Sequence, residues 1–362
     1  MLLAINSSNQ YIFANLANRS ERYRCPACKK PVVLRHGQQN VAHFAHQVQA
    51  GCHSFTEGET IDHLLGKMAL YQHFAKDYRV VVEPVLSQIS QRPDLLVKRP
   101  RETDLAIEYQ CSPIGKKRLQ ERNEGLKSLG LEVLWVLGPA YYQRRLSGEL
   151  TCRFLYGGRL FFYVPKQKRF DTRFNFSKTD FHKLQYESQT GFAAIAASLA
   201  SSAEKDKSDC SGRGTIKQSV VDQTKSVCPT SDLDQHLLYQ RTKITLLMVQ
   251  GRVKVDLINY LYERGHRLDQ IPDWCLLGQA FGLAVPNWHF RLVLVLLLER
   301  VRLNHWIVEE RLSARLRQYF YPSFQDHEKI LKATYADLAA SGVICLQGNK
   351  ILVIKLLQFV AD

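Results

Sequence analysis

The order of helix and strand patterns between residues 56 and 138 constrains the fold of this chain more than any other feature. Apolar residues three to four positions apart predict an amphipathic helix over 56–77, and a second helix is expected over 114–130. Apolar runs predict strands over 78–87, 92–98, 104–112 and 131–138. The predicted order is α-β-β-β-α-β, which indicates a mixed α/β domain.

The third predicted strand carries a carboxylate and an amide on one face. Strand side chains alternate between faces, so Glu108 and Gln110 point to one side. Acidic residues are depleted in strands, and an unpaired buried carboxylate is costly. Either this face is solvated, or a cation lies against it. Asp94, which follows a proline, sits on the preceding strand, and antiparallel pairing would bring it to Glu108.

Two such carboxylates are the ligands that Mg²⁺ prefers, and Glu59 on the first helix is placed to add a third oxygen. A metal held there would bind a scissile phosphate and lower the pKa of a bound water, which Gln110 would orient. The alternatives are structural: Asp94 as a turn residue, Glu108 on a solvated face, and Glu59 as a first-turn acid.

A cysteine–histidine cluster precedes this domain. Cys25 and Cys28 in "CPAC" and His43 and His46 in "HFAH" flank a predicted hairpin, the layout of a zinc ribbon. A segment this small buries little core without a metal, so we expect structural zinc. The alternative is a hairpin with reduced, metal-free cysteines. The third and fourth ligands are open, with Cys52 and His53 as further candidates.

The charge of the chain points to a polyanionic partner. Lys and Arg number 49 against 34 Asp and Glu, for a formal net charge of +15. Nucleic acid is the commonest such partner; an anionic membrane surface or no such partner are the alternatives. The start of the chain does not read as a secretory signal, the apolar stretch 292–299 is too short to span a bilayer, and nine mostly scattered cysteines fit a reducing compartment. We therefore expect a cytoplasmic protein without a membrane span.

The motifs "PD" at 93–94 and "EYQ" at 108–110 resemble the metal motif of the PD-(D/E)xK nuclease superfamily. Together with "CPAC…HFAH", "IEYQCSPI" and "EVLWVLG", they resemble the CoiA competence-protein family of Gram-positive bacteria over about 1–165. The resemblance implies a multidomain α+β and α/β protein with a zinc-ribbon-like N-terminus, a restriction-endonuclease-like core and a variable C-terminal region. Asp94 and Glu108 would bind Mg²⁺ or Mn²⁺, with Glu59 assisting.

One position departs from that superfamily's common pattern. Gln110 stands where a lysine usually positions the attacking water, and glutamine carries no charge. Lys67 lies on the same helix face as Glu59 and is our candidate for the missing ammonium; a solvated helix face is the alternative.

Basic side chains suggest where DNA binds. Lys116, Lys117 and Arg122 lie on the second predicted helix. The segment 165–178 interleaves Lys168, Arg169 and Arg173 with phenylalanines, which fits a single-strand contact. The same segment would equally suit packing against the C-terminal region.

We expect four regions: a zinc-ribbon-like segment (1–55), a nuclease-like domain (56–165), a basic, aromatic segment with a polar linker (166–235) and a helical domain (236–362). At the C-terminus, a helix followed by two strands is typical of a winged helix and equally of an α+β cap. The expected function is metal-dependent processing of incoming or recombining DNA in natural transformation, on single-stranded or branched DNA, with recombination proteins as further partners. A catalytically silent scaffold and a DNA-binding transcription regulator are the alternatives.

Overall fold

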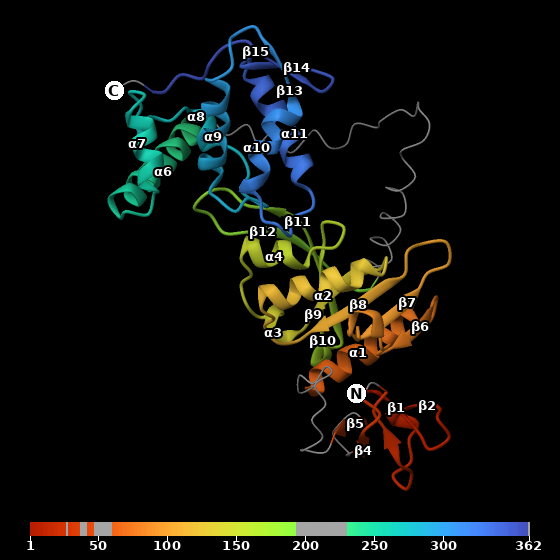
Figure 1. Cartoon of the computed structure of the whole chain (residues 1–362). Coiled ribbons are helices and arrows are strands. Elements are labelled where there is room, and N and C mark those ends of the chain that lie inside the picture. Colours follow the sequence, from red (N-terminus) through yellow and green to blue (C-terminus); the bar gives the residue numbers. More distant parts are fainter. Residues whose placement is uncertain (27, 37–41, 47–59, 193–229, 361–362) are drawn as a thin grey trace. The chain divides into compact units, whose positions relative to one another are not determined.

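The computed structural model describes residues 1–26, 28–36, 42–46, 60–192 and 230–360 (Figure 1). The described residues divide into two compact units. The first contains residues 1–146, 154–174 and 187–192, as far as these are described, and the second contains residues 147–153, 175–186 and 230–360.

The N-terminal part of the first unit is a small sheet with strand order β2-β1-β3-β4-β5. Its elements are β1 (Leu3–Ile5), β2 (Tyr11–Phe13), η1 (Ala14–Leu16), β3 (Tyr23–Arg24), β4 (Pro31–Arg35) and β5 (His43–His46). The hairpin predicted between the cysteines and histidines corresponds to β4 and β5, which pair antiparallel. The core of this sheet is small and includes Tyr23, Val32 and Phe44, as expected for so short a segment.

The main sheet of the first unit has seven strands, and each lies beside its neighbour in sequence: β12-β11-β10-β9-β8-β7-β6. The strands are β6 (Arg79–Val82), β7 (Leu95–Lys98), β8 (Leu105–Gln110), β9 (Glu132–Leu137), β10 (Leu160–Val164), β11 (Arg169–Ser177) and β12 (Gln185–Thr190). β8 pairs parallel with β9, and β9 with β10, whereas β6, β7 and β8 pair antiparallel. With α1 (Ile61–Phe74) before β6 and α2 (Lys116–Ser128) between β8 and β9, the predicted order α-β-β-β-α-β is present.

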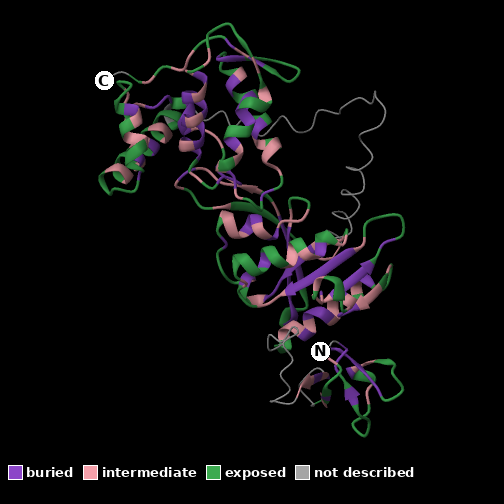
Figure 2. Ribbon diagram, viewed as in Figure 1, coloured by how far each residue is buried: buried purple, intermediate pink, exposed green. Residues whose placement is uncertain are grey.

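Alternation along β8 divides the core between two helices. Ile107 and Tyr109 pack in one cluster with Leu64 and Phe74 of α1. On the strand next to β8, Trp135 of β9 donates a hydrogen bond from Nε1 to Asn123 Oδ1 of α2 at 2.8 Å. Figure 2 shows β8 mostly buried: Glu108 is buried and sits inside the domain, whereas Gln110 at the end of the strand is only partly buried.

Two details of α1 differ from its predicted apolar stripe. The helix begins at Ile61, where the Thr60 side chain accepts a hydrogen bond from His63 N at 3.2 Å, and Ile61 itself is exposed. Lys67, by contrast, is buried, which excludes the alternative of a solvated face.

Segment 165–178 contributes β11 to the sheet. Phe170 is buried in the main core, so it is not available to stack on a base. Farther along the segment, the ring of Phe176 stacks on that of Phe281 at 5.3 Å, both within the second unit. Of the two roles that the sequence left open for this segment, Phe176 therefore has the second, packing against the C-terminal region.

The second unit is mostly helical. Its principal elements are α4 (Gly148–Phe154), α6 (Thr230–Val249), α7 (Val255–Tyr262), α8 (Asp273–Leu276), α9 (Asn287–Leu298), β13 (Trp306–Val308), α10 (Glu309–Leu316), η5 (Arg317–Tyr319), α11 (His327–Ala340), β14 (Ile344–Gln347) and β15 (Lys350–Val353). The buried Asp180 carboxylate accepts hydrogen bonds from the N–H groups of Asn287 and Trp288, both at 2.8 Å, and so caps α9. None of the helices in the described part of the chain combines the length and apolar character needed to cross a bilayer.

Candidate functional site

The two carboxylates predicted from the sequence face each other where β7 and β8 meet. Leu95 pairs with Ile107 in the antiparallel register, so Asp94, one residue before β7, lies across from Glu108. Asp94 Oδ2 accepts a hydrogen bond from Tyr109 N at 2.8 Å. The proline before Asp94 has no N–H to donate, which suits the point where the strand begins.

Lys67 brings a buried cation to these carboxylates from α1. Its ammonium donates a hydrogen bond to Glu83 Oε1 and lies 3.6 Å from Asp94 Oδ1, and its side chain is fully buried. Glu83 follows β6, and its N–H donates to the Asp94 carbonyl at 2.9 Å. Lys67 is therefore buried because two carboxylates compensate its charge.

His63 joins the group from one turn earlier on α1. Its Nε2 lies 3.3 Å from Asp94 Oδ2, and its ring stacks on Tyr109 with centroids 5.8 Å apart. The sequence shows that His63 and Lys67 share a helix face, four residues apart, and that spacing was the available signal for His63. The sequence contained no spacing or motif that would have identified Glu83 as a site residue; it showed only that Glu83 lies at the end of a predicted strand.

The pKa values of the two facing carboxyl groups are shifted in opposite directions. Burial alone would raise the pKa of Asp94, but the charges of His63 and Lys67 lower it well below its usual range. Burial raises the pKa of Glu108 to about 7, the charge of Asp94 adds to the rise, and Arg122 opposes it. The surroundings of Asp94 thus favour its ionised form, whereas the burial of Glu108 favours its protonated form.

Arg122 and Gln110 both differ from the roles that the sequence suggested. Arg122 Nη2 donates to Glu108 Oε1 and lies 3.4 Å from the Arg92 carbonyl, so this guanidinium covers the carboxylate. The Gln110 amide donates to the Ser112 carbonyl at 2.6 Å. In this conformation the Gln110 Nε2 hydrogen bond goes to the backbone, not to the carboxylates.

The donor set fits a divalent cation in its chemistry. Asp94 and Glu108 supply carboxylate oxygens, which Mg²⁺ and Mn²⁺ prefer. Because the register of β7 and β8 places Asp94 across from Glu108, two ionised carboxylates would repel each other there, and a divalent cation would offset that repulsion. Such an ion would compete with Arg122 for Glu108. Glu59 lies outside the described residues.

The other basic residues are dispersed. Lys116 and Lys117 are exposed at the start of α2, and Lys168 is exposed after β10. Arg169 pairs with Asp171 at 2.9 Å. Arg173 is buried, with its guanidinium 4.3 Å from the centroid of Phe162, so it packs inside the domain.

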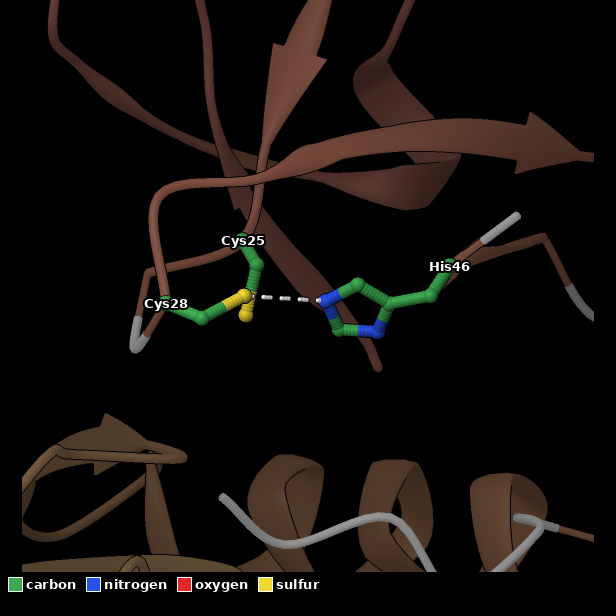
Figure 3. A group of neighbouring side chains, drawn as sticks. All are labelled: Cys25, Cys28 and His46. Carbon is green, nitrogen blue, oxygen red and sulfur yellow. Dashed lines mark hydrogen bonds between the residues drawn. The ribbon is translucent and has the colours of Figure 1, made fainter. Parts of the chain in front are cut away.

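Three of the four predicted zinc ligands converge. Cys25, Cys28 and His46 place their ligand atoms within 4.8 Å of one another, and Figure 3 shows the two thiols and the imidazole turned toward one point. The Cys28 Sγ to His46 Nε2 distance is 3.3 Å. Burial lowers the pKa of His46, which favours the neutral imidazole that a metal requires. Two thiols and an imidazole at this spacing fit three positions of a tetrahedral zinc site.

His43 lies on the opposite face of β5. It pairs with Arg35, whereas His46 pairs with Val32, and residues three apart on a strand face opposite ways. His43 lines a groove of about 1120 Å³ together with Arg19, Arg22, Arg24 and Arg35. Cys52 and His53, the other candidates for a fourth ligand, lie outside the described residues.

Two domains of one known protein family match the chain. The family described as "Competence protein CoiA, nuclease-like domain" matches residues 59–192, and "Competence protein CoiA, N-terminal domain" matches 6–55. A stretch of 131 residues is 36% identical to the "Competence protein CoiA" of Bacillus subtilis (strain 168) and covers 36% of this chain and 35% of that protein. The match thus spans about a third of the curated relative. No solved structure matches the chain significantly.

Proposed function

Since the chain belongs to the CoiA competence-protein family, we propose that its nuclease-like domain hydrolyses phosphodiester bonds in DNA that enters or recombines during natural transformation. The observation that carries this proposal is the convergence of Asp94, Glu108 and the buried ammonium of Lys67 at one end of β7 and β8. We assign the domain to the PD-(D/E)xK superfamily, with Asp94 as the aspartate of "PD" and Glu108 as the strand acid.

Asp94 and Glu108 would hold Mg²⁺ or Mn²⁺, which when bound polarises the scissile phosphate and lowers the pKa of a bound water. Lys67 takes the place of the lysine missing at Gln110, because its ammonium lies 3.6 Å from Asp94 Oδ1. Fixed by Glu83, it is positioned to stabilise negative charge that develops on the phosphate. Tyr109 N holds the Asp94 carboxylate in place through its hydrogen bond of 2.8 Å.

For the N-terminal part we propose a structural zinc held by Cys25, Cys28 and His46, with Cys52 and His53 as the candidates for the fourth ligand. The small apolar core beside these ligands supports this role, since metal binding would supply the stability that so short a segment lacks. The groove lined by four arginines on the opposite face of β5 supports contact with a nucleic-acid backbone. Lys116 and Lys117 would add phosphate contacts near the carboxylates.

One observation favours a second candidate, a catalytically silent domain that joins DNA to recombination proteins. The carboxylates already have cations of their own: Arg122 on Glu108, and Lys67 between Glu83 and Asp94. If Arg122 remained on Glu108, no metal would bind there. Displacement of Arg122 is therefore the step on which the two candidates differ.

A cleavage assay separates the candidates. Purified protein would be incubated with end-labelled single-stranded, duplex and branched DNA, with Mg²⁺ or Mn²⁺ added. We expect cleavage that Asp94→Ala and Lys67→Met each reduce by at least about 100-fold, in line with the loss of one electrostatic group. Lys127→Met, a change at an exposed lysine of α2 that has no assigned role, is the matched control and should retain most activity. If wild type and Asp94→Ala give identical products at identical rates, the enzyme proposal is wrong, and DNA binding without cleavage would support the scaffold.

A further inference from the structure

The α-helices and strands of the second unit from α9 onward follow a distinctive order. After α9 come β13, α10, α11, β14 and β15. β15 lies between β13 and β14 in the sheet and pairs antiparallel with both. The first strand thus pairs with the last, and the β14–β15 hairpin follows directly after α11. This order of helices and strands is the topology of a winged-helix domain, in which α10 and α11 form the helix-turn-helix.

The three helices are fixed to one another by polar side-chain contacts. Arg291 of α9 is buried, donates to the Trp274 carbonyl at 3.0 Å and pairs with Asp337 of α11 at 2.7 Å. Ser313 of α10 and Tyr335 of α11 are hydrogen-bonded at 3.1 Å. The orientation of α11 is therefore fixed by the buried Tyr335 and by Asp337, whose side chain is exposed, and it does not depend on Lys329 or Lys332.

Arginine side chains compensate the negative charges of three acidic residues in this region. Arg317 Nη2 donates to Glu310 Oε2 and Glu328 Oε1, both at 2.7 Å, and Arg291 compensates Asp337. The nearby lysines have no such compensation. Lys329 and Lys332 are exposed on the outer face of α11, Lys350 is exposed in the hairpin, and none of the three has an ion-pair partner among the described residues.

The outer face of α11 also carries several small side chains. Ala333, Ala336 and Ala340 are exposed along the same side as the two lysines. Small side chains let a helix enter the major groove of B-DNA closely, and the groove is wide enough for one helix. Lysines on the helix and the hairpin would then reach phosphates on either side.

We propose that α9 through β15 form a winged-helix module that binds duplex DNA, with α11 in the major groove and Lys350 of the hairpin on the backbone. This binding site is separate from the carboxylates and needs neither a metal nor cleavage. It would bring duplex DNA to a protein whose nuclease-like domain is expected to act on single-stranded or branched DNA.

The test uses the full chain carrying Asp94→Ala, with no added divalent metal, so that cleavage plays no part. Fluorescence anisotropy would measure affinity for a 20-base-pair duplex and for a single strand of equal length over a range of salt concentrations. The test variant is Lys329→Ala/Lys332→Ala/Lys350→Ala. The control, Lys183→Ala/Arg252→Ala/Lys254→Ala, removes the same charge from exposed positions elsewhere in this unit.

We expect the test variant to lose at least tenfold in duplex affinity at about 0.1 M salt, and the control about twofold or less. Three lost phosphate contacts should lower the magnitude of the salt slope by about 2.7. Urea unfolding should leave both variants within about 0.5 kcal/mol of the parent, because the changed residues are exposed. Equal losses in the two variants, or an equal loss for duplex and single strand, would overturn the proposal. A negative result in the cleavage assay would leave this proposal unaffected, because DNA binding is measured in the Asp94→Ala protein without added metal.

Discussion

Gly66→Ala would test whether the close approach of α1 to β8 fixes the carboxylate site. A Cβ at Gly66 would overlap the Tyr109 ring at its Cε1, Cζ and Cδ1 atoms. The ring has little room to move, because Tyr109 is 1% exposed and its hydroxyl donates to the Tyr163 carbonyl at 2.9 Å. Either α1 shifts outward or the ring leaves its place.

The magnitude follows from two opposed effects. Alanine favours a helix over glycine by about 1 kcal/mol, whereas overpacking a well-filled core costs about 1–3 kcal/mol. Since the ring is fixed at both ends, we expect a cost near the upper value and a net destabilisation of about 2 kcal/mol. An outward shift of α1 would also move Lys67, next to Gly66, away from Asp94, so cleavage should fall even where the protein is folded.

Urea unfolding would measure the stability, and hydrogen exchange of peptides from α1 and β8 would show whether the loss is local. Gly125→Ala is the matched control: a Cβ there would meet only the end of the Gln91 side chain, which can turn away. Gly66→Ala combined with Tyr109→Leu should be less damaging than the sum of the single changes, by about 1–2 kcal/mol. A Gly66→Ala protein as stable as wild type, or more stable, would refute the reasoning, since helix propensity alone predicts that result.

Three further predictions concern single side chains. Lys67→Met should destabilise the first unit by about 3–5 kcal/mol in urea, because it leaves buried carboxylates uncompensated, and adding Glu83→Gln should recover part of that loss. His46→Ala should lower bound zinc from about one equivalent to less than half, as measured by elemental analysis, whereas His43→Ala should leave it unchanged. Asp180→Ala should cost the second unit about 2 kcal/mol in urea by removing the cap of α9, and Asp180→Asn should cost about half as much.

Each of these has a contrary result. A Lys67→Met protein of wild-type stability would mean that the two carboxylates are protonated or solvated when the lysine is absent. Zinc loss in His43→Ala equal to that in His46→Ala would place both histidines at the metal. Equal effects of alanine and asparagine at Asp180 would show that the carboxylate charge, and not hydrogen bonding, stabilises α9.

The element order of the nuclease-like domain could be predicted because its signals are local. Helical spacing along α1 and apolar runs in β7, β8 and β9 depend only on neighbouring residues, and the pairing of Asp94 with Glu108 follows once β7 and β8 are antiparallel. The predicted bounds exceed the observed ones at most ends, where backbone hydrogen bonding stops before the apolar pattern does.

The sequence could not show which groups several candidate site residues contact, because those contacts depend on the tertiary structure. Arg122 looked like a phosphate contact, yet it reaches Glu108, because α2 covers that face of the sheet. Arg173 was also predicted to contact DNA because it lies in a basic segment, but its side chain points from β11 toward the Phe162 ring. His43 and His46 share a motif, and only the register of β4 and β5 shows that they face opposite ways. Each case depends on which face of an element is covered, and charge patterns do not encode that.

The strand order of the main sheet has a consequence for how the protein is made. Every strand lies beside its neighbour in sequence, but the loops that the pairings close differ in length. The β7–β8 pairing closes only a short loop, which keeps the entropic cost of that step low, whereas β8–β9 and β9–β10 each close across a connection that contains helices. During synthesis the sheet can grow by adding each new strand to the edge formed by the one before. The β7–β8 hairpin would bring Asp94 and Glu108 together early, before Arg122 is synthesised. The carboxylates would meet first, and their covering guanidinium would arrive afterwards with α2.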